Sequence, residues 1–189
     1  MQNRQRRRPA AGKPGGNAVN AADFKIRRCA NAAPRPGSIA DCAHAVLIDA
    51  EQIANLIPHA GRMCLLEGVM AWDAESIRCT AVSHTRADNP LRRRGRLSAL
   101  CGIEYGAQAM ALHGALTAAE GQTQRAGLLA SVRDLKCYAS TLDAFDNPLL
   151  IDAQLLLSEA NRVIYAFSVS CDGRPLLAGR NAVVLGPMH

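Results

Sequence analysis

The chain has 189 residues, of which 49% are apolar, so it is long enough for one domain with a sizeable core and short for two. Its formal net charge is +6, but residues 1–44 carry nine Lys or Arg and only two acids. Residues 45–189 hold thirteen basic and fourteen acidic residues. This near-neutral body argues against a nucleic-acid-binding core, because such a core needs a dedicated basic face to displace counterions.

The cysteines and the apolar runs restrict the class of protein further. Seven cysteines lie singly, without a CxxC pair, so the sequence predicts neither a zinc site nor a disulfide framework. No apolar run approaches the roughly 20 residues of a membrane span, and the Arg-rich N-terminus lacks the apolar region of a secretory signal. We therefore expect a cytoplasmic protein without a membrane span, and no metal or other cofactor is indicated.

The segment of residues 1–44 is rich in Pro, Gly, Ala and Arg and contains one aromatic residue, Phe24. Such a composition buries too little apolar surface to offset the entropy of ordering, so we expect a disordered extension. Its RQRRR run fits either a docking tail for an acidic partner or a solvated extension. The folded domain is expected to occupy residues 45–189.

The first elements of this domain are a short helix and a hairpin. Residues 50–59 have an amphipathic helical pattern that ends at Pro58. Two strands are predicted at 63–72 and 75–83, joined as a hairpin across Asp73 and Ala74. An irregular polar stretch follows, and Pro90 and Gly95 interrupt regular structure there.

Residues 97–119 form the longest predicted element. The stretch contains no proline and is dominated by Ala, Leu and Met, so it indicates one helix of about 20 residues. Three glycines, at 102, 106 and 114, each cost such a helix up to about 1 kcal/mol relative to Ala. This cost is tolerable if the glycines let a sheet approach closely. Because the helix is apolar nearly all round, we expect it to be buried.

Four further strands are predicted at 127–138, 148–157, 162–170 and 175–185. Asn161 and the Asp172-Gly173 pair lie where antiparallel hairpins would turn. A single apolar helix among six antiparallel strands is packed most simply if the sheet wraps around it. We therefore predict an α+β fold in which a six-stranded antiparallel sheet surrounds one long central helix.

This layout and two sequence segments resemble a known family. The segment LIPHAGRMCLLEGV (56–69) is similar to the opening of bacterial 3-hydroxyacyl-[acyl-carrier-protein] dehydratases, which have the hotdog fold. The segment 83–116 resembles the active-site strand end, loop and central helix of the subgroup found with aryl polyene and related pigment pathways. The matching residues, in order, are His84, Asn89, Pro90, Gly95, Glu104, Ala107 and Gln108.

One departure from the family pattern follows His84. The better-known dehydratases have Phe-Pro directly after the catalytic histidine and a shorter loop before the acid, whereas Thr85-Arg86 and a longer loop follow His84 here. The contacts made with substrate are expected to differ accordingly.

The resemblance implies dehydration of a 3-hydroxyacyl thioester to the trans-2-enoyl product, in fatty-acid-like or aryl polyene biosynthesis. Such a reaction removes a weakly acidic C2 proton and protonates a poor leaving hydroxyl, so two groups with opposite roles must face the substrate. By resemblance, His84 takes the C2 proton. Glu104, reached across a dimer interface, acts on the hydroxyl.

The resemblance also implies a substrate-binding set of Asn89, Pro90, Gly95 and Gln108. Gly95 precedes the helix, whose N-terminal N–H groups suit the developing charge of a thioester carbonyl, although a simple loop glycine is the alternative. Gln108 lies one turn after Glu104 and either holds its carboxyl or packs.

Two further histidines, His59 and His113, are interpreted as residues without a catalytic role. His59 resembles a structural position of the family. His113 faces another side of the helix from Glu104 and is interpreted as a satisfied or exposed histidine.

Arg92 and Arg93, with Arg94 and Arg96, form the densest cluster of charge in the body. They are candidates for docking the acidic acyl carrier protein and the phosphate of its phosphopantetheine arm, or they form a solvated loop. The expected partners are therefore an acyl carrier protein and a second hotdog subunit, in a homodimer or a heterodimer. No nucleic acid is expected.

Two other functions remain open on the same fold. An acid on the central helix can also activate water in a thioesterase, although such an enzyme usually lacks a histidine in the position of His84. A non-catalytic subunit that binds acyl chains or completes a heterodimer is the second alternative.

Overall fold

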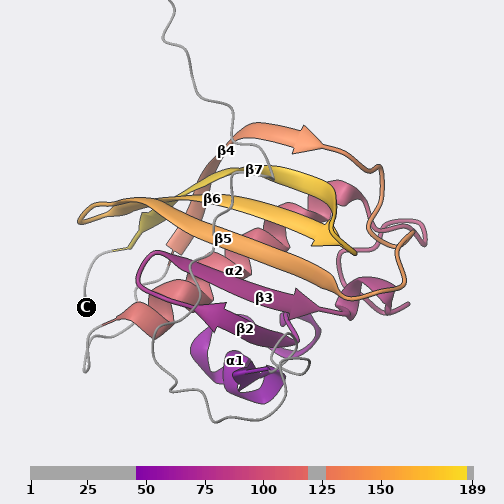
Figure 1. Ribbon diagram of the computed structural model, residues 1–189, viewed down its shortest axis with the longest axis horizontal. Helices are drawn as coiled ribbons and strands as arrows, with labels where there is room; N and C mark the ends of the chain where they lie inside the picture. Colours follow the sequence, from indigo (N-terminus) through magenta and orange to yellow (C-terminus); the bar gives the residue numbers. More distant parts are fainter. Residues whose placement is uncertain (1–45, 119–126, 187–189) are drawn as a thin grey trace, which may run out of the picture.

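The computed structural model describes residues 46–118 and 127–186, and Figure 1 shows one sheet curved over a long helix. The extension of residues 1–44, predicted to be disordered, lies outside the described residues. The sheet is antiparallel throughout and has the strand order β1-β2-β3-β5-β6-β7-β4. The predicted α+β hotdog architecture is therefore confirmed.

The elements agree with the sequence pattern apart from their ends. In the described part of the chain the sheet has seven strands, because a two-residue strand, β1, precedes the six that were predicted. β2 begins at Gly68 rather than at residue 63. The elements are β1 (Ile48–Asp49), α1 (Ala50–Leu56), β2 (Gly68–Trp72), β3 (Ser76–Ala81), α2 (Gly102–Thr117), β4 (Gly127–Cys137), β5 (Leu149–Ser158), β6 (Arg162–Cys171) and β7 (Arg174–Leu185).

The predicted turns are present and have local causes. The Asp73 side chain accepts hydrogen bonds from the backbone N–H groups of Glu75 and Ser76, both at 2.8 Å, which closes the β2–β3 hairpin. At the β6–β7 turn, Asp172 and Gly173 have φ values of 50° and 73°. Two successive left-handed residues match the twist of a two-residue hairpin, which explains the Asp-Gly pair.

The pairing of β3 with β5 brings two distant loops together. Ala81, the last residue of β3, lies opposite Leu149, the first residue of β5. The residues that follow β3 therefore lie beside those that precede β5. Arg78 and Asp152 face each other in the same register and form a two-pronged ion pair, with distances of 2.7 and 3.0 Å.

The helix α2 lies against the concave face of the sheet (Figure 1). A Cβ atom added at Gly106 would lie 2.6 Å from Phe167, and one at Gly102 would lie 2.8 Å from Leu177. These two glycines therefore permit the close approach that was predicted. Gly114 does not, because nothing lies within 4 Å of a Cβ built there.

His113 fastens the second half of α2 to the sheet. Its Nδ1 lies 2.7 Å from the hydroxyl of Tyr165 on β6, and its Nε2 lies 2.8 Å from the carbonyl oxygen of Asp73. The side chain is fully buried, so both hydrogen bonds replace lost contacts with water. His113 is therefore a satisfied histidine with a structural role.

The β4 edge of the sheet is unpaired within the described residues. β4 pairs with β7 on one side and with no strand of the described part on the other. Its first residues are exposed, and Leu128 retains 75% of its accessible surface. Across residues 46–118 and 127–186, no helix is long and apolar enough to cross a membrane.

Candidate functional site

His84 lies in a short turn, Ser83–Thr85, directly after β3. Ser83 secures the turn, because its hydroxyl donates to the carbonyl of Leu65 at 2.8 Å. The imidazole of His84 is fully buried and reaches the loop before β5. Its Nε2 lies 3.0 Å from the carbonyl oxygen of Phe145.

This contact fixes the proton on the imidazole. A carbonyl oxygen can only accept, so Nε2 must donate and carries the hydrogen. The second nitrogen, Nδ1, then holds a lone pair. It is buried and has no hydrogen-bond partner among the described residues. In the neutral imidazole, Nδ1 is therefore an available hydrogen-bond acceptor.

The environment keeps this imidazole neutral. Burial lowers the pKa of His84 below the usual value of histidine, and this effect outweighs the carbonyl groups of Phe145 and Asn147, which raise it. The positive charge of Arg92 lowers the pKa further, whereas Asp146 opposes it. A neutral imidazole at neutral pH is the form that accepts a proton.

Asn89 shapes the polar loop after His84. Its side-chain oxygen accepts from the N–H of Leu91 at 2.9 Å, and its amide donates to the carbonyl of Ser83 at 2.9 Å and to the hydroxyl of Tyr105 at 3.1 Å. Asn89 is buried, whereas Pro90 beside it is exposed. Asn89 therefore joins the loop to both His84's turn and helix α2.

Arg92 holds the same loop from the outside. Its guanidinium donates to the carbonyl oxygens of Arg86, Gly95 and His84 at 2.8, 2.8 and 3.0 Å, and it lies 3.3 Å from Asp143. Its side chain is only 16% exposed. Arg92 is thus engaged within the chain.

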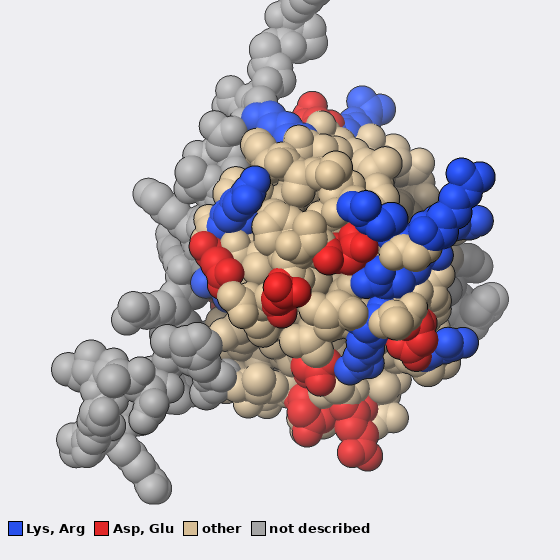
Figure 2. All heavy atoms as spheres, turned by 90° about the vertical axis from the view of Figure 1, so that its right-hand side faces the viewer, with Lys and Arg blue, Asp and Glu red and all other residues tan. Residues whose placement is uncertain are grey.

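Gly95 and the other arginines lie further out on this loop. Gly95 has φ of +76°, a conformation that strains residues with a side chain. Arg93 and Arg94 are exposed, and Figure 2 shows that Lys and Arg gather on one side of this face of the molecule. The charge available to a partner is therefore carried by Arg93 and Arg94 more than by Arg92.

Glu104 lies in the first turn of α2. Its Oε1 lies 3.0 Å from Nε2 of Gln108 and 3.1 Å from Nε2 of His59. Gln108 is itself fixed, because it accepts from the N–H of Leu65 at 2.9 Å and donates to the carbonyl of Met63 at 2.8 Å. The carboxyl is therefore held in one orientation.

The two predicted catalytic residues do not touch in this chain. His84 contacts the loop that contains Phe145, and Glu104 contacts the segment that contains His59. No hydrogen bond or ion pair joins them within residues 46–118 and 127–186. Between them lies the contact of Tyr105 with Ser83, at 2.8 Å between the two hydroxyl oxygens. The single chain supplies both groups but leaves them facing different segments.

Sequence reasoning missed three members of the site. Phe145 contributes a backbone carbonyl, which no side-chain pattern reveals. His59 was interpreted as structural, and its contact with Glu104 depends on the path of the chain between α1 and β2. Tyr105 offered a signal, because a tyrosine on an apolar helix needs a partner for its hydroxyl.

A curved antiparallel sheet over a buried helix, with a buried histidine at a strand end and an acid in the first helical turn, defines a hotdog domain. The model of the ApeP-like family, described as ApeP dehydratase, matches residues 51–187. The chain therefore belongs to this family of dehydratases. The match confirms the resemblance to the dehydratase subgroup of aryl polyene pathways that was drawn from the sequence.

Solved structures support the fold. The dehydratase heterocomplex ApeI:P from Xenorhabdus doucetiae contains a chain that is 24% identical, with a TM-score of 0.64, over 71% of this chain and 91% of that one. A mutant thioesterase from Pseudomonas aeruginosa is 14% identical, with a TM-score of 0.54, over 75% and 96% of the two chains. A search of curated protein sequences found no match.

Proposed function

We propose that this protein dehydrates 3-hydroxyacyl thioesters carried on an acyl carrier protein to trans-2-enoyl thioesters, in aryl polyene or fatty-acid-like biosynthesis. The observation that carries the proposal is the state of His84. Its Nε2 is engaged with Phe145, while its buried Nδ1 has no partner among the described residues. A neutral base enclosed in this way suits the removal of a weakly acidic proton, because water is kept away from the nitrogen that accepts it.

The elimination needs two proton transfers. His84 Nδ1 takes the proton from C2, and the electrons of the broken C–H bond form the C2–C3 double bond. The C3–O bond breaks, and Glu104 gives its proton to the departing hydroxyl, which leaves as water. His84 is then protonated and Glu104 ionised, and exchange of protons with solvent restores both groups.

The remaining predicted residues are assigned supporting roles. Gly95 supplies an N–H to the thioester carbonyl, and Arg92 holds the following peptide by donating to the carbonyl oxygen of Gly95. Asn89 and Pro90 shape the loop that borders the substrate. Gln108 and His59 hold the Glu104 carboxyl. These roles follow from the contacts within the chain and from the family to which it belongs.

A second hotdog subunit is part of the proposal, because His84 and Glu104 face different segments of one chain. A partner that docked along the open edge of β4 would extend the sheet. It would also bring its own helix acid near His84. We propose either a homodimer or a heterodimer with a related hotdog subunit, and the similarity to a dehydratase heterocomplex supports the second form.

The carrier protein is proposed to dock on the arginine-bearing loop. Arg93 and Arg94 are exposed there and make no side-chain hydrogen bond to the described residues. Reversing Arg93 to Glu should weaken binding of an acidic carrier without loosening the loop. Reversal of Arg92 would do both, because its guanidinium holds three backbone carbonyls. Unchanged affinity of the Arg93→Glu variant, measured by titration, would remove this docking surface from the proposal.

The decisive experiment follows the acyl group by intact mass. The purified protein, alone and with a candidate partner subunit, is incubated with a 3-hydroxyacyl carrier-protein thioester. Loss of one water from the acyl group supports dehydration. Release of the free carrier thiol indicates a thioesterase instead. Binding without turnover in every combination indicates a non-catalytic subunit.

A further inference from the structure

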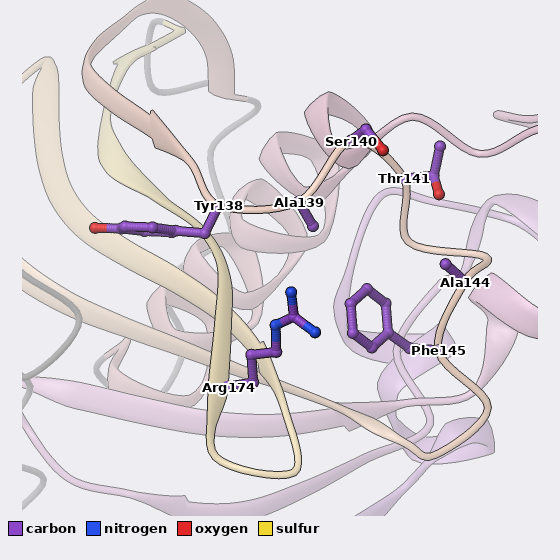
Figure 3. Close-up of a pocket in the computed structure, with 7 residues that line it drawn as sticks. All are labelled: Tyr138, Ala139, Ser140, Thr141, Ala144, Phe145 and Arg174. Atoms are coloured by element: carbon purple, nitrogen blue, oxygen red, sulfur yellow. The ribbon is translucent and has the colours of Figure 1, made fainter.

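A cavity of about 390 Å³ lies beside the loop between β4 and β5, the loop whose Phe145 carbonyl contacts His84. Figure 3 shows its two sides: the loop after β4 on one, and Arg174 at the start of β7 on the other. Both the size and the mixture of aromatic, hydroxyl and cationic groups are those of a small-molecule site. The lining residues are Tyr138, Ala139, Ser140, Thr141, Ala144, Phe145 and Arg174.

The two sides of the cavity are fastened to each other. The backbone N–H of Tyr138 donates to the carbonyl of Leu176 at 2.9 Å. At the other end, the side-chain amide of Asn147 donates to Asp172 at 2.8 Å. Arg174 lies between these two ties in the chain, so the opening between it and the loop is kept by the fold.

The guanidinium of Arg174 is available to a ligand. Its terminal carbon lies 5.6 Å from the centre of the Phe145 ring, a cation–π contact that orients the group. The guanidinium forms no hydrogen bond or ion pair with any residue of the described ranges, and the side chain of Arg174 is exposed. Stacking uses the face of a guanidinium and leaves its N–H donors free for a ligand.

A second arginine contacts the opposite wall of the cavity. Arg96 donates to the hydroxyl of Thr141 at 3.4 Å. The nearby acid, Asp143, lies 3.3 Å from Arg92 and 3.5 Å from Arg96, so its charge is already matched. The guanidinium of Arg174 and the hydroxyl groups of Ser140 and Thr141 therefore line the cavity, and Arg96 contacts this lining through Thr141. This combination favours an anion with several acceptor oxygens.

The cavity and the proposed base share a residue. The ring of Phe145 forms part of the cavity wall, and its backbone carbonyl accepts the hydrogen bond from His84 Nε2 at 3.0 Å. A ligand that fills the cavity therefore lies one residue away from the imidazole. An anion bound beside Arg174 and a reacting group beside His84 would be two ends of one elongated molecule.

We propose that this cavity binds the phosphate of a phosphopantetheine arm, with Arg174 as its principal cation, and that the thioester end of the arm extends past Phe145 toward His84. The inference rests on the proposed function, because it assumes an acyl thioester substrate. Phosphopantetheine is common to carrier proteins and coenzyme A, and the cavity recognises the part that they share.

Three substrates with the same 3-hydroxyacyl group test the proposal: the carrier-protein thioester, the coenzyme A thioester, and the N-acetylcysteamine thioester, which lacks the phosphate. Replacing Arg174 with Ala should raise KM for the first two by about tenfold, the effect of losing one charge-assisted hydrogen bond. The N-acetylcysteamine substrate should be unaffected. Arg174→Lys should recover part of the loss, since it keeps the charge without the planar fork.

Arg162→Ala is the matched control. Arg162 is an exposed arginine at the start of β6, paired with Glu159, so its loss changes the net charge equally. It should leave KM for all three substrates unchanged. An equal loss with all three substrates in Arg174→Ala would overturn the proposal in favour of a structural role. A loss with the carrier substrate alone would overturn it in favour of a contact with the carrier's protein surface.

Direct binding separates this inference from the proposed function. If the protein dehydrates none of the three thioesters, the proposed function fails. Titration calorimetry with coenzyme A still tests whether the cavity binds phosphopantetheine. Binding that weakens by about tenfold in Arg174→Ala, and not in Arg162→Ala, supports a phosphopantetheine site. Equal affinity in all three proteins, or no binding to any, overturns it.

Discussion

His84 and His113 are both fully buried histidines, and their surroundings differ in one respect. His113 uses both ring nitrogens, one with Tyr165 and one with Asp73. His84 uses Nε2 only and leaves Nδ1 without a partner among the described residues. Burial lowers the pKa of both. Burial and a lowered pKa are therefore common to the two histidines, and the unpartnered Nδ1 is what sets His84 apart from His113.

The largest expected effect is on the activity of His84→Gln. The glutamine amide can still donate to the carbonyl of Phe145, but it offers no base. The rate of dehydration should fall by about 10²- to 10⁴-fold, the usual contribution of a general base. Melting temperature, followed by circular dichroism, should change little. Retention of more than a tenth of the wild-type rate would contradict the assignment of His84 as base.

Glu104→Gln should come next, with a loss of about a hundredfold in kcat. The amide keeps the size of the side chain and can still contact Gln108, but it cannot release a proton. Substrate binding should be nearly unchanged, so KM serves as the control. Full activity with intact folding would show that another group protonates the leaving hydroxyl.

The same exchange at the structural histidine should have the opposite outcome. In His113→Gln, the amide offers a donor and an acceptor in a geometry that differs from that of the two ring nitrogens. The contacts with Tyr165 and Asp73 should therefore weaken, and the free energy of unfolding should fall by about 1–3 kcal/mol. Chemical denaturation measures this loss. The activity of the folded fraction should remain within about twofold of wild type. A large fall in kcat without loss of stability would bring His113 into the catalytic site.

His59 tests how firmly the Glu104 carboxyl must be held. Replacing His59 with Ala removes one of the two hydrogen bonds to that carboxyl, and a loss of about tenfold in kcat is expected. His59→Gln retains a donor and should recover much of the rate. Recovery by Gln separates an orienting role from a proton-transfer role, for which glutamine would not suffice.

The smallest effect concerns stability and pH. Because the folded chain lowers the pKa of His84 and of His113, the unfolded chain binds more protons below about pH 6.5. The free energy of unfolding should be unaffected by these two groups above that pH and should fall as the pH decreases below it. The fall should be smaller in His113→Gln. Denaturation curves recorded from about pH 7.5 to about pH 5 provide the measurement.

Much of the fold was accessible from the sequence because its signals are local. Alternating apolar residues marked β6, the Asp172-Gly173 pair marked its turn, and the absence of proline marked α2. The two-residue strand β1 has no such signal. β2 begins later than predicted because Met63 belongs to a short turn, Gly61–Met63, and the N–H of Leu65 donates to the side chain of Gln108 instead of to a neighbouring strand.

The site was only partly accessible because its contacts join distant segments. The types and order of His84, Glu104 and Gln108 were recognisable. The i to i+4 spacing made a contact between the last two one of two alternatives, and the structure has that contact. The contact of His84 with Phe145 depends on the register that sets Ala81 opposite Leu149, which the sequence does not specify. The cation–π contact of Arg174 also depends on tertiary packing.

The open edge of β4 has a practical consequence for handling the protein. Its first residues, from Gly127 to Ala130, are exposed and uncharged. The basic residues Arg133 and Lys136 lie only in the second half of the strand. An exposed apolar strand edge is a template for aggregation. If the proposed partner is a related hotdog subunit, expression without it should yield much insoluble material, and co-expression with it should increase the soluble yield.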